Sequence, residues 1–238
     1  MKMELRKAIR LTKYSLSLKM NLICMVTMLV LGLLMEWGFC YVNDYQANAM
    51  TVPFLPISMG TFFIICAALF PAQMVISLDV GTMVQTSPYK RKLQTLFPTV
   101  LNGVSMTIAL LLVVLIRGIS WVLTGKDYVW DSLLYVGVIA AVLMVYSMFV
   151  YKFFVLSIIV LYFVMFFGGF TWGIITKTGR FSFLSKDFAA NLSPVWAVLL
   201  SIGMIVIASM IHYGATRLLY KRPLSKYAFG AALQRASR

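Results

Sequence analysis

The chain has 238 residues, of which 61% are apolar and 12% are charged, and its 21 Lys and Arg outnumber its 7 Asp and Glu. Soluble domains carry about 45–50% apolar and 25% charged residues. This composition therefore excludes an ordinary soluble globule, a disordered protein and a nucleic-acid-binding domain. It predicts an all-α integral membrane protein, because a membrane span requires about 20 predominantly apolar residues.

The apolar residues fall into six segments. They lie at about 21–41, 55–78, 99–123, 132–150, 154–175 and 194–216. About 20 residues of helix span the ~30 Å hydrocarbon core, so each segment is long enough to cross the membrane. We therefore expect one domain, residues 1–238, with six transmembrane helices and a tight hairpin between the fourth and the fifth.

The basic residues predict the orientation of these spans. Most of them precede the first span, follow the sixth, or lie in the second-to-third and fourth-to-fifth connections. Because cytoplasmic loops are enriched in Lys and Arg, both termini are expected in the cytoplasm, including the tail 217–238. In this arrangement all the tryptophans fall at or near the outer interface, namely Trp37, Trp121, Trp130, Trp172 and Trp196.

Residues 1–19 alternate basic and apolar side chains at helical spacing. The basic stripe consists of Lys2, Arg6, Arg10 and Lys13. Such a pattern is typical of a helix that lies in the membrane interface, with its apolar face in the lipid and its basic face on anionic headgroups. The alternative is a plain basic flank that only determines topology.

The connection between the second and third spans contains a short basic helix signal. The run reads Ser87-Pro88-Tyr89-Lys90-Arg91-Lys92-Leu93. Serine followed by proline is typical of a helix start, and Pro98 predicts a stop. Cations at a helix N-terminus oppose the macrodipole, so local stability does not explain them. We interpret the run as a surface for a protein partner or for lipid headgroups; a basic inner loop is the simpler alternative.

Two charged residues lie inside predicted spans. Glu36 is in the first span and Arg117 is in the third, each about 22–27 Å from the cytoplasmic boundary. An isolated charge at depth costs on the order of 3 kcal/mol, and such residues usually face the bundle interior and pair. We hypothesise an interhelical ion pair that joins these two spans. The alternative is that each side chain reaches the outer interface separately.

Catalytic and metal-binding patterns are absent from the sequence. His212 is the only histidine, and Cys24, Cys40 and Cys66 have no metal-ligand spacing. No phosphate-binding G-x-x-x-x-G-K-[ST] motif occurs. We therefore expect no catalytic residue, no metal site and no cofactor bound by this chain.

Together these features resemble the permease subunit of a type-2 ABC transporter, the membrane subunit of a bacterial ABC exporter. The resemblance rests on residues 1–19, the run from Thr86 to Lys92, and the connection 176–194 that ends in Asn191-Leu192-Ser193-Pro194. It implies an interfacial helix before the first span and short outer helices between spans five and six. It also implies a coupling helix at Ser87–Leu93 that docks on an ATPase.

The same resemblance implies the partners and the setting. ATP and magnesium would bind separate cytoplasmic ATPase subunits, and a second permease, identical or related, would complete the translocation path. The expected location is the plasma membrane of a bacterium. The apolar spans favour an amphipathic or lipophilic substrate such as a peptide, an antibiotic or a lipid. The alternatives are an ATPase-independent secondary transporter and a membrane immunity or scaffold protein.

Overall fold

The computed structural model describes only helices as regular elements within the residues that it covers. These residues are 18–41, 57–78, 90–126, 130, 132–147, 153, 155–156, 159 and 192–221. The helices are α2 (Leu18–Tyr41), α4 (Met59–Leu78), α6 (Lys90–Gln94), α7 (Leu96–Thr124), α8 (Leu133–Ser147) and α12 (Pro194–Leu219). The expected interfacial helix 1–19 lies outside the described residues except for its last two, which already belong to α2.

The long helices are apolar, as the composition predicts. Three are long and apolar enough to cross a membrane, namely Asn21–Tyr41, Lys90–Thr124 and Pro194–Leu219. The apolar helices Met59–Ala72, which is part of α4, and Leu133–Ser147 are shorter. This all-α, membrane-type architecture agrees with the coarse sequence prediction. The expected fifth span, 154–175, falls almost entirely outside the described residues.

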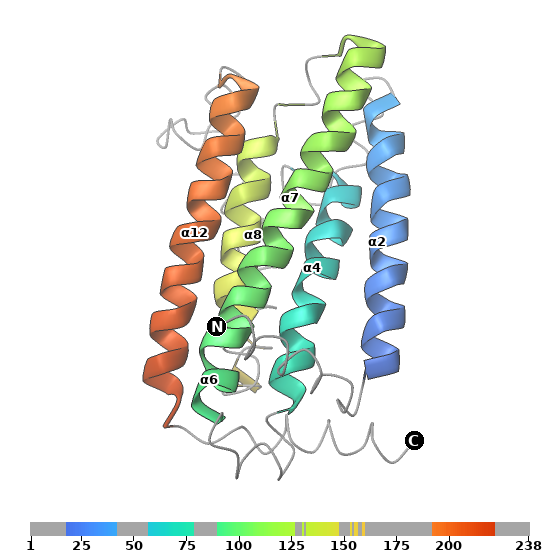
Figure 1. The fold of residues 1–238 in the computed structure, drawn as a ribbon. Helices are drawn as coiled ribbons and strands as arrows, with labels where there is room; N and C mark the ends of the chain where they lie inside the picture. Colours follow the sequence, from blue (N-terminus) through green and yellow to red (C-terminus); the bar gives the residue numbers. More distant parts are fainter. Residues whose placement is uncertain are drawn as a thin grey trace.

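The long helices lie side by side in a bundle in which α7 is central (Figure 1). α7 packs against α2, α4, α8 and α12, so it contacts every other long helix of the described chain. The shared core contains Ile64 from α4, Met106 and Leu110 from α7, Val136 from α8 and Ile205 from α12. α8 finishes and α12 starts at opposite ends of the bundle (Figure 1).

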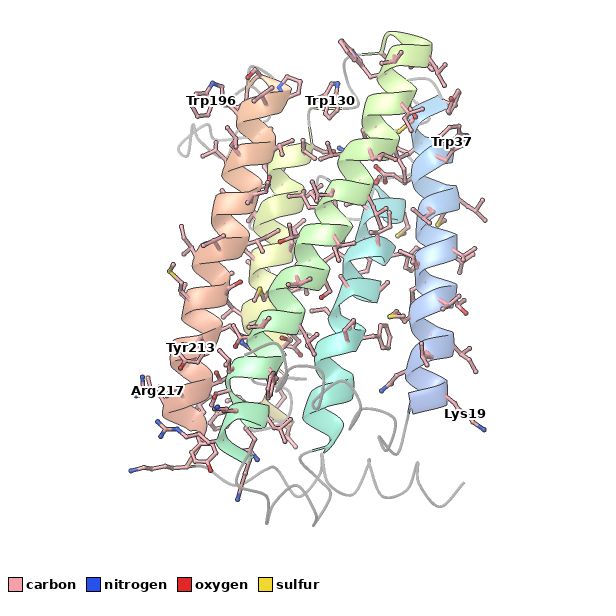
Figure 2. The ribbon with its side chains drawn as sticks, in the orientation of Figure 1. Lys19, Trp37, Trp130, Trp196, Tyr213 and Arg217 are labelled. Atoms are coloured by element: carbon pink, nitrogen blue, oxygen red, sulfur yellow. The ribbon has the colours of Figure 1, made fainter. Side chains whose placement is uncertain are left out.

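The two ends of the bundle differ in chemistry (Figure 2). Trp37, Trp130 and Trp196 lie at one end, which we call the tryptophan end, and Lys19 and Arg217 lie at the other, the basic end. Tryptophan is enriched at membrane–water interfaces, and Lys and Arg are enriched on the cytoplasmic side, so both features are those of a bundle that spans a bilayer.

Pro98 does not end the short basic helix, and that part of the sequence prediction is wrong. α6 ends at Gln94, the chain bends at Thr95, and Pro98 lies in the first turn of α7. Proline is tolerated there because the first backbone N–H groups of a helix have no intrahelical acceptor. The Thr95 hydroxyl donates to the carbonyl of Arg91 at 2.7 Å, which satisfies one of the last carbonyl groups of α6.

α2 and α4 approach each other closely through glycine. A Cβ atom on Gly60 would lie 2.3 Å from the backbone nitrogen and 2.7 Å from the Cα of Glu36. A Cβ on Gly32 would lie 2.8 Å from the side chain of Ile64. Small residues at such crossings let helix backbones pack in van der Waals contact within a membrane.

Substituting Gly60 by alanine should force α2 and α4 apart. Because backbone atoms, which cannot rotate away, occupy the required space, we expect a loss of about 1–3 kcal/mol in stability. The measurement is the unfolding midpoint of the full chain in detergent micelles.

The matched control is Gly203→Ala in α12, where a Cβ would meet no atom within 4 Å. We expect no loss there, and a gain of up to about 1 kcal/mol from helix propensity. Equal midpoints for the two variants would contradict the close crossing.

Candidate functional site: two buried polar clusters

The first cluster lies near the tryptophan end and joins four helices. It consists of Glu36 from α2, Ser58 and Thr61 at the start of α4, Arg117 from α7, and Ser132 immediately before α8. We call these five residues the ionic cluster. Glu36 is the only Asp or Glu among the described residues, so the described cations have no other carboxylate among these residues with which to pair.

Glu36 and Arg117 form a direct ion pair inside the bundle. The Nε of Arg117 donates to the Oε1 of Glu36 at 2.8 Å, and both side chains are fully buried. The structure thus brings together the two charged residues that the sequence places in the first and third predicted spans. Neither side chain reaches separately toward an interface.

Two hydroxyl groups at the start of α4 bind the other carboxylate oxygen. The Thr61 hydroxyl donates to Glu36 Oε2 at 2.8 Å, and the Ser58 hydroxyl bonds the same oxygen. The Ser58 Oγ also accepts the backbone N–H of Thr61 at 3.1 Å, so Ser58 caps α4. The carboxylate therefore lies at a helix N-terminus, where the macrodipole stabilises negative charge.

The rest of the guanidinium group reaches α8, α4 and an aromatic ring. Nη1 of Arg117 donates to the Oγ of Ser132 at 2.9 Å, and Nη2 donates to the Oγ1 of Thr61 at 3.2 Å. The ring of Phe39 lies 5.8 Å from the guanidinium carbon, within cation–π range. Arginine suits this position because its planar guanidinium group carries five N–H donors and can bind several acceptors at once.

The ionic cluster is built to hold helices together. Each charge is matched by an opposite charge and by neutral hydrogen-bond partners, and neither Glu36 nor Arg117 has exposed surface. A buried ion pair is stable only when additional hydrogen bonds compensate for its desolvation, and this one has them on both sides. Its geometry links α2, α4, α7 and α8 near one end of the bundle.

Removing either charge should destabilise the fold strongly. Glu36→Gln and Arg117→Met each leave the other charge buried and unpaired, which we expect to cost about 3–5 kcal/mol. The double variant should lose clearly less than the sum of the single losses, because it removes both charges. The measurement is a double-mutant cycle on chemical unfolding in micelles.

A matched control is Lys126→Gln. Lys126 is a cation near the same end whose bond to the Tyr41 carbonyl, 3.1 Å long, is exposed. Exposed polar pairs contribute about 0–1 kcal/mol, so only a small change is expected. Strictly additive losses in the cycle would show that Glu36 and Arg117 do not act as a pair.

A second cluster of polar residues lies toward the basic end, where α7, α8 and α12 meet. The Oγ1 of Thr99 lies 2.7 Å from the Nδ1 of His212, and the Nδ2 of Asn102 donates to the Oγ of Ser147 at 3.0 Å. All four side chains are buried. We call Thr99, Asn102, Ser147 and His212 the inner polar cluster.

The predicted coupling residues are described from Lys90 onward. Leu93 is 1% exposed and attaches α6 to the bundle, whereas Arg91 and Lys92 are exposed and Lys90 is half-buried. The remaining predicted residues of this group and of the interfacial helix lie outside the described residues. These are Ser87, Pro88, Tyr89, Lys2, Arg6, Arg10 and Lys13.

Sequence reasoning missed the neutral partners of both clusters. Ser58 and Thr61 form a Ser-x-x-Thr cap before an apolar run, a local signal that could have indicated the start of α4. Thr99 and Asn102 lie three residues apart, on one face of a helix that is otherwise apolar. No local signal shows which helix each of these side chains will meet.

Within the described residues, no group of three or more His, Cys, Asp or Glu side chains could hold a metal ion. The cysteines Cys24, Cys40 and Cys66 are not joined by disulfides. Comparison with known protein families, curated proteins and solved structures finds no match to this chain.

Proposed function

We propose that this chain is the permease subunit of an ATP-driven ABC exporter, located in the plasma membrane of a bacterium. Its apolar helices would line or enclose the path for an amphipathic or lipophilic substrate such as a peptide, an antibiotic or a lipid. ATP and magnesium would bind cytoplasmic ATPase subunits. A second permease, identical or related, would complete the path.

The observation that carries this proposal is α6. It is a separate short helix at the basic end, with Leu93 buried against the bundle and with Arg91 and Lys92 exposed. The chain bends at Thr95 and continues directly into α7, the helix that packs against all the other long helices described. A partner that pushed on α6 would therefore act on the central helix of the bundle.

The ionic cluster also supports a permease that is moved by a separate ATPase subunit. It joins α2, α4, α7 and α8 near the tryptophan end, whereas α6 lies at the basic end (Figures 1 and 2). A bundle held firmly at one end and contacted at the other suits a subunit that transmits a partner's movement. A membrane scaffold or immunity protein would not need a basic helix attached to its central span.

Reversing the charge of α6 should separate the two subunits. In the variant Lys90→Glu, Arg91→Glu, Lys92→Glu, we expect the copurifying ATPase to be lost, or its ATP hydrolysis to become independent of substrate. The physical reason is that like charges would face a partner surface complementary to the cations. The measurement is copurification in detergent, followed by ATPase assays in liposomes.

The control reverses the same number of charges at the same end, on α2, on α12 and just after α12. The variant Lys19→Glu, Arg217→Glu, Lys221→Glu alters three other exposed cations and should retain the ATPase. If the unmodified chain purifies without an ATPase and transports without ATP, a secondary transporter is the correct class instead.

The proposed orientation can be tested separately. In a variant without the native cysteines, a single cysteine replacing Lys126 should react with a membrane-impermeant thiol reagent added to intact cells. A cysteine replacing Arg91 should react only after the membrane is opened. Arg91 is exposed and Lys126 is partly exposed, so a reagent can reach both positions from water. The opposite pattern would reverse the orientation and overturn the proposed cytoplasmic docking.

A further inference from the structure

The inner polar cluster contains two buried atoms that lack partners. Within the part of the chain that the structure describes, the Nε2 of His212 and the Oδ1 of Asn102 have no hydrogen-bond partner. Both side chains have 0% exposed surface. Buried polar atoms are nearly always satisfied by protein or by ordered water, so two such atoms at one helix crossing point to a bound group.

The hydrogen bonds of Thr99 identify the state of His212. The Thr99 hydroxyl has one proton, and it donates this proton to the Thr95 carbonyl at 2.9 Å. With the hydroxyl proton directed at this carbonyl, the contact of 2.7 Å with His212 uses the hydroxyl as an acceptor and Nδ1–H as the donor. Nε2 is left with a lone pair, which makes it a buried hydrogen-bond acceptor.

The same reasoning orients the amide of Asn102. The Ser147 hydroxyl lies 2.7 Å from the Met144 carbonyl. With its proton directed there, it accepts from Asn102. The amide nitrogen of Asn102, 3.0 Å away, supplies that bond. Its oxygen is thus the free atom, and it too is an acceptor.

The two acceptors belong to the same crossing of helices. Asn102 lies one turn beyond Thr99 on the same side of α7, and His212 is bonded to Thr99. One turn away from His212 on α12, Ser209 lies next to α7, because a Cβ on Gly103 would stand 2.9 Å from its Oγ. Asn102 in turn reaches α8 through Ser147.

The chemistry of the site selects a neutral donor. The charged residues that the structure describes at the basic end are all cations, on α2, on α6, on α12 and just after α12. The described carboxylate, Glu36, is paired with Arg117. Among the described residues a cationic ligand would therefore find no opposite charge. A water molecule has two hydrogens to donate and fits two acceptors without introducing charge.

We propose that His212 and Asn102 form a binding site for one internal water molecule, which donates one hydrogen to Nε2 and the other to Oδ1. This water completes a neutral polar contact among α7, α8 and α12 close to the start of α7. It satisfies both acceptors while the surrounding helix faces remain apolar.

Because His212 is the only histidine, the test can be made on the whole chain. Protein labelled with ¹⁵N-histidine and purified through a tag without histidine shows one imidazole in the nitrogen spectrum, in bilayers at neutral pH. We expect a protonated Nδ1, an unprotonated Nε2 at the frequency of a hydrogen-bonded acceptor, and a magnetisation transfer from water protons to the ring.

The variant Asn102→Leu removes one of the two acceptors. We expect the magnetisation transfer from water to be lost. The resonance of Nε2 should move to the frequency of an unprotonated nitrogen without a hydrogen bond. Thr107→Val is the matched control, since it removes an α7 hydroxyl whose bond, 2.8 Å to the Gly103 carbonyl, stays within its own helix. It should leave the imidazole signals unchanged.

Three results would overturn the proposal, and all can be read from the native protein even if Asn102→Leu does not fold. One is an Nε2 resonance at the frequency of a nitrogen without a hydrogen bond and without magnetisation transfer from water, which would mean that no water occupies the site. Another is a proton on Nε2, which would reverse the donor and acceptor roles. The last is transfer from lipid or detergent protons in place of water, which would mean that a hydroxyl of another molecule occupies the site.

Discussion

The ion pair between Glu36 and Arg117 is the constraint around which the tryptophan end of the bundle is organised. In an apolar medium a single charge is costly, so each residue must find the other or leave the interior. Their pairing at 2.8 Å brings α2 against α7. It also requires hydroxyl donors for the second carboxylate oxygen, and the start of α4 provides them through Ser58 and Thr61.

The close packing of α2 and α4 follows from the same requirement. For the start of α4 to reach the carboxylate, its backbone must pass next to Glu36, and only a residue without a Cβ fits there. Gly60 is that residue. The polar network and the glycine crossing are therefore two parts of one arrangement, in which the hydrogen bonds of the carboxylate determine how near the helices lie.

The basic end is organised differently. Among the residues that the structure describes there, the buried polar side chains are neutral and the charges are cations, all exposed except the half-buried Lys90. The short helix α6 is joined to the central helix α7 through a bend at Thr95. Hydrogen bonds between neutral groups in membrane proteins are worth only about 0.6 kcal/mol on average. Contacts at this end can thus rearrange more easily than the ion pair, which suits a region where a partner is proposed to act.

The sequence by itself determined the membrane character, the approximate positions of the described helices, the basic and aromatic ends, and the two charged residues that had to pair or reach an interface. These follow from composition and from local patterns, because an apolar run of sufficient length becomes a helix in lipid whatever surrounds it. The tertiary structure decided which faces meet. In the structure α7 is central, and Pro98, which the sequence predicts at a helix end, lies in the first turn of α7. The partners of the ion pair are Ser58, Thr61 and Ser132. The tertiary structure also brought His212 to Thr99, 113 residues away. Such choices depend on distances between helices far apart in the chain, and helical periodicity does not carry that information.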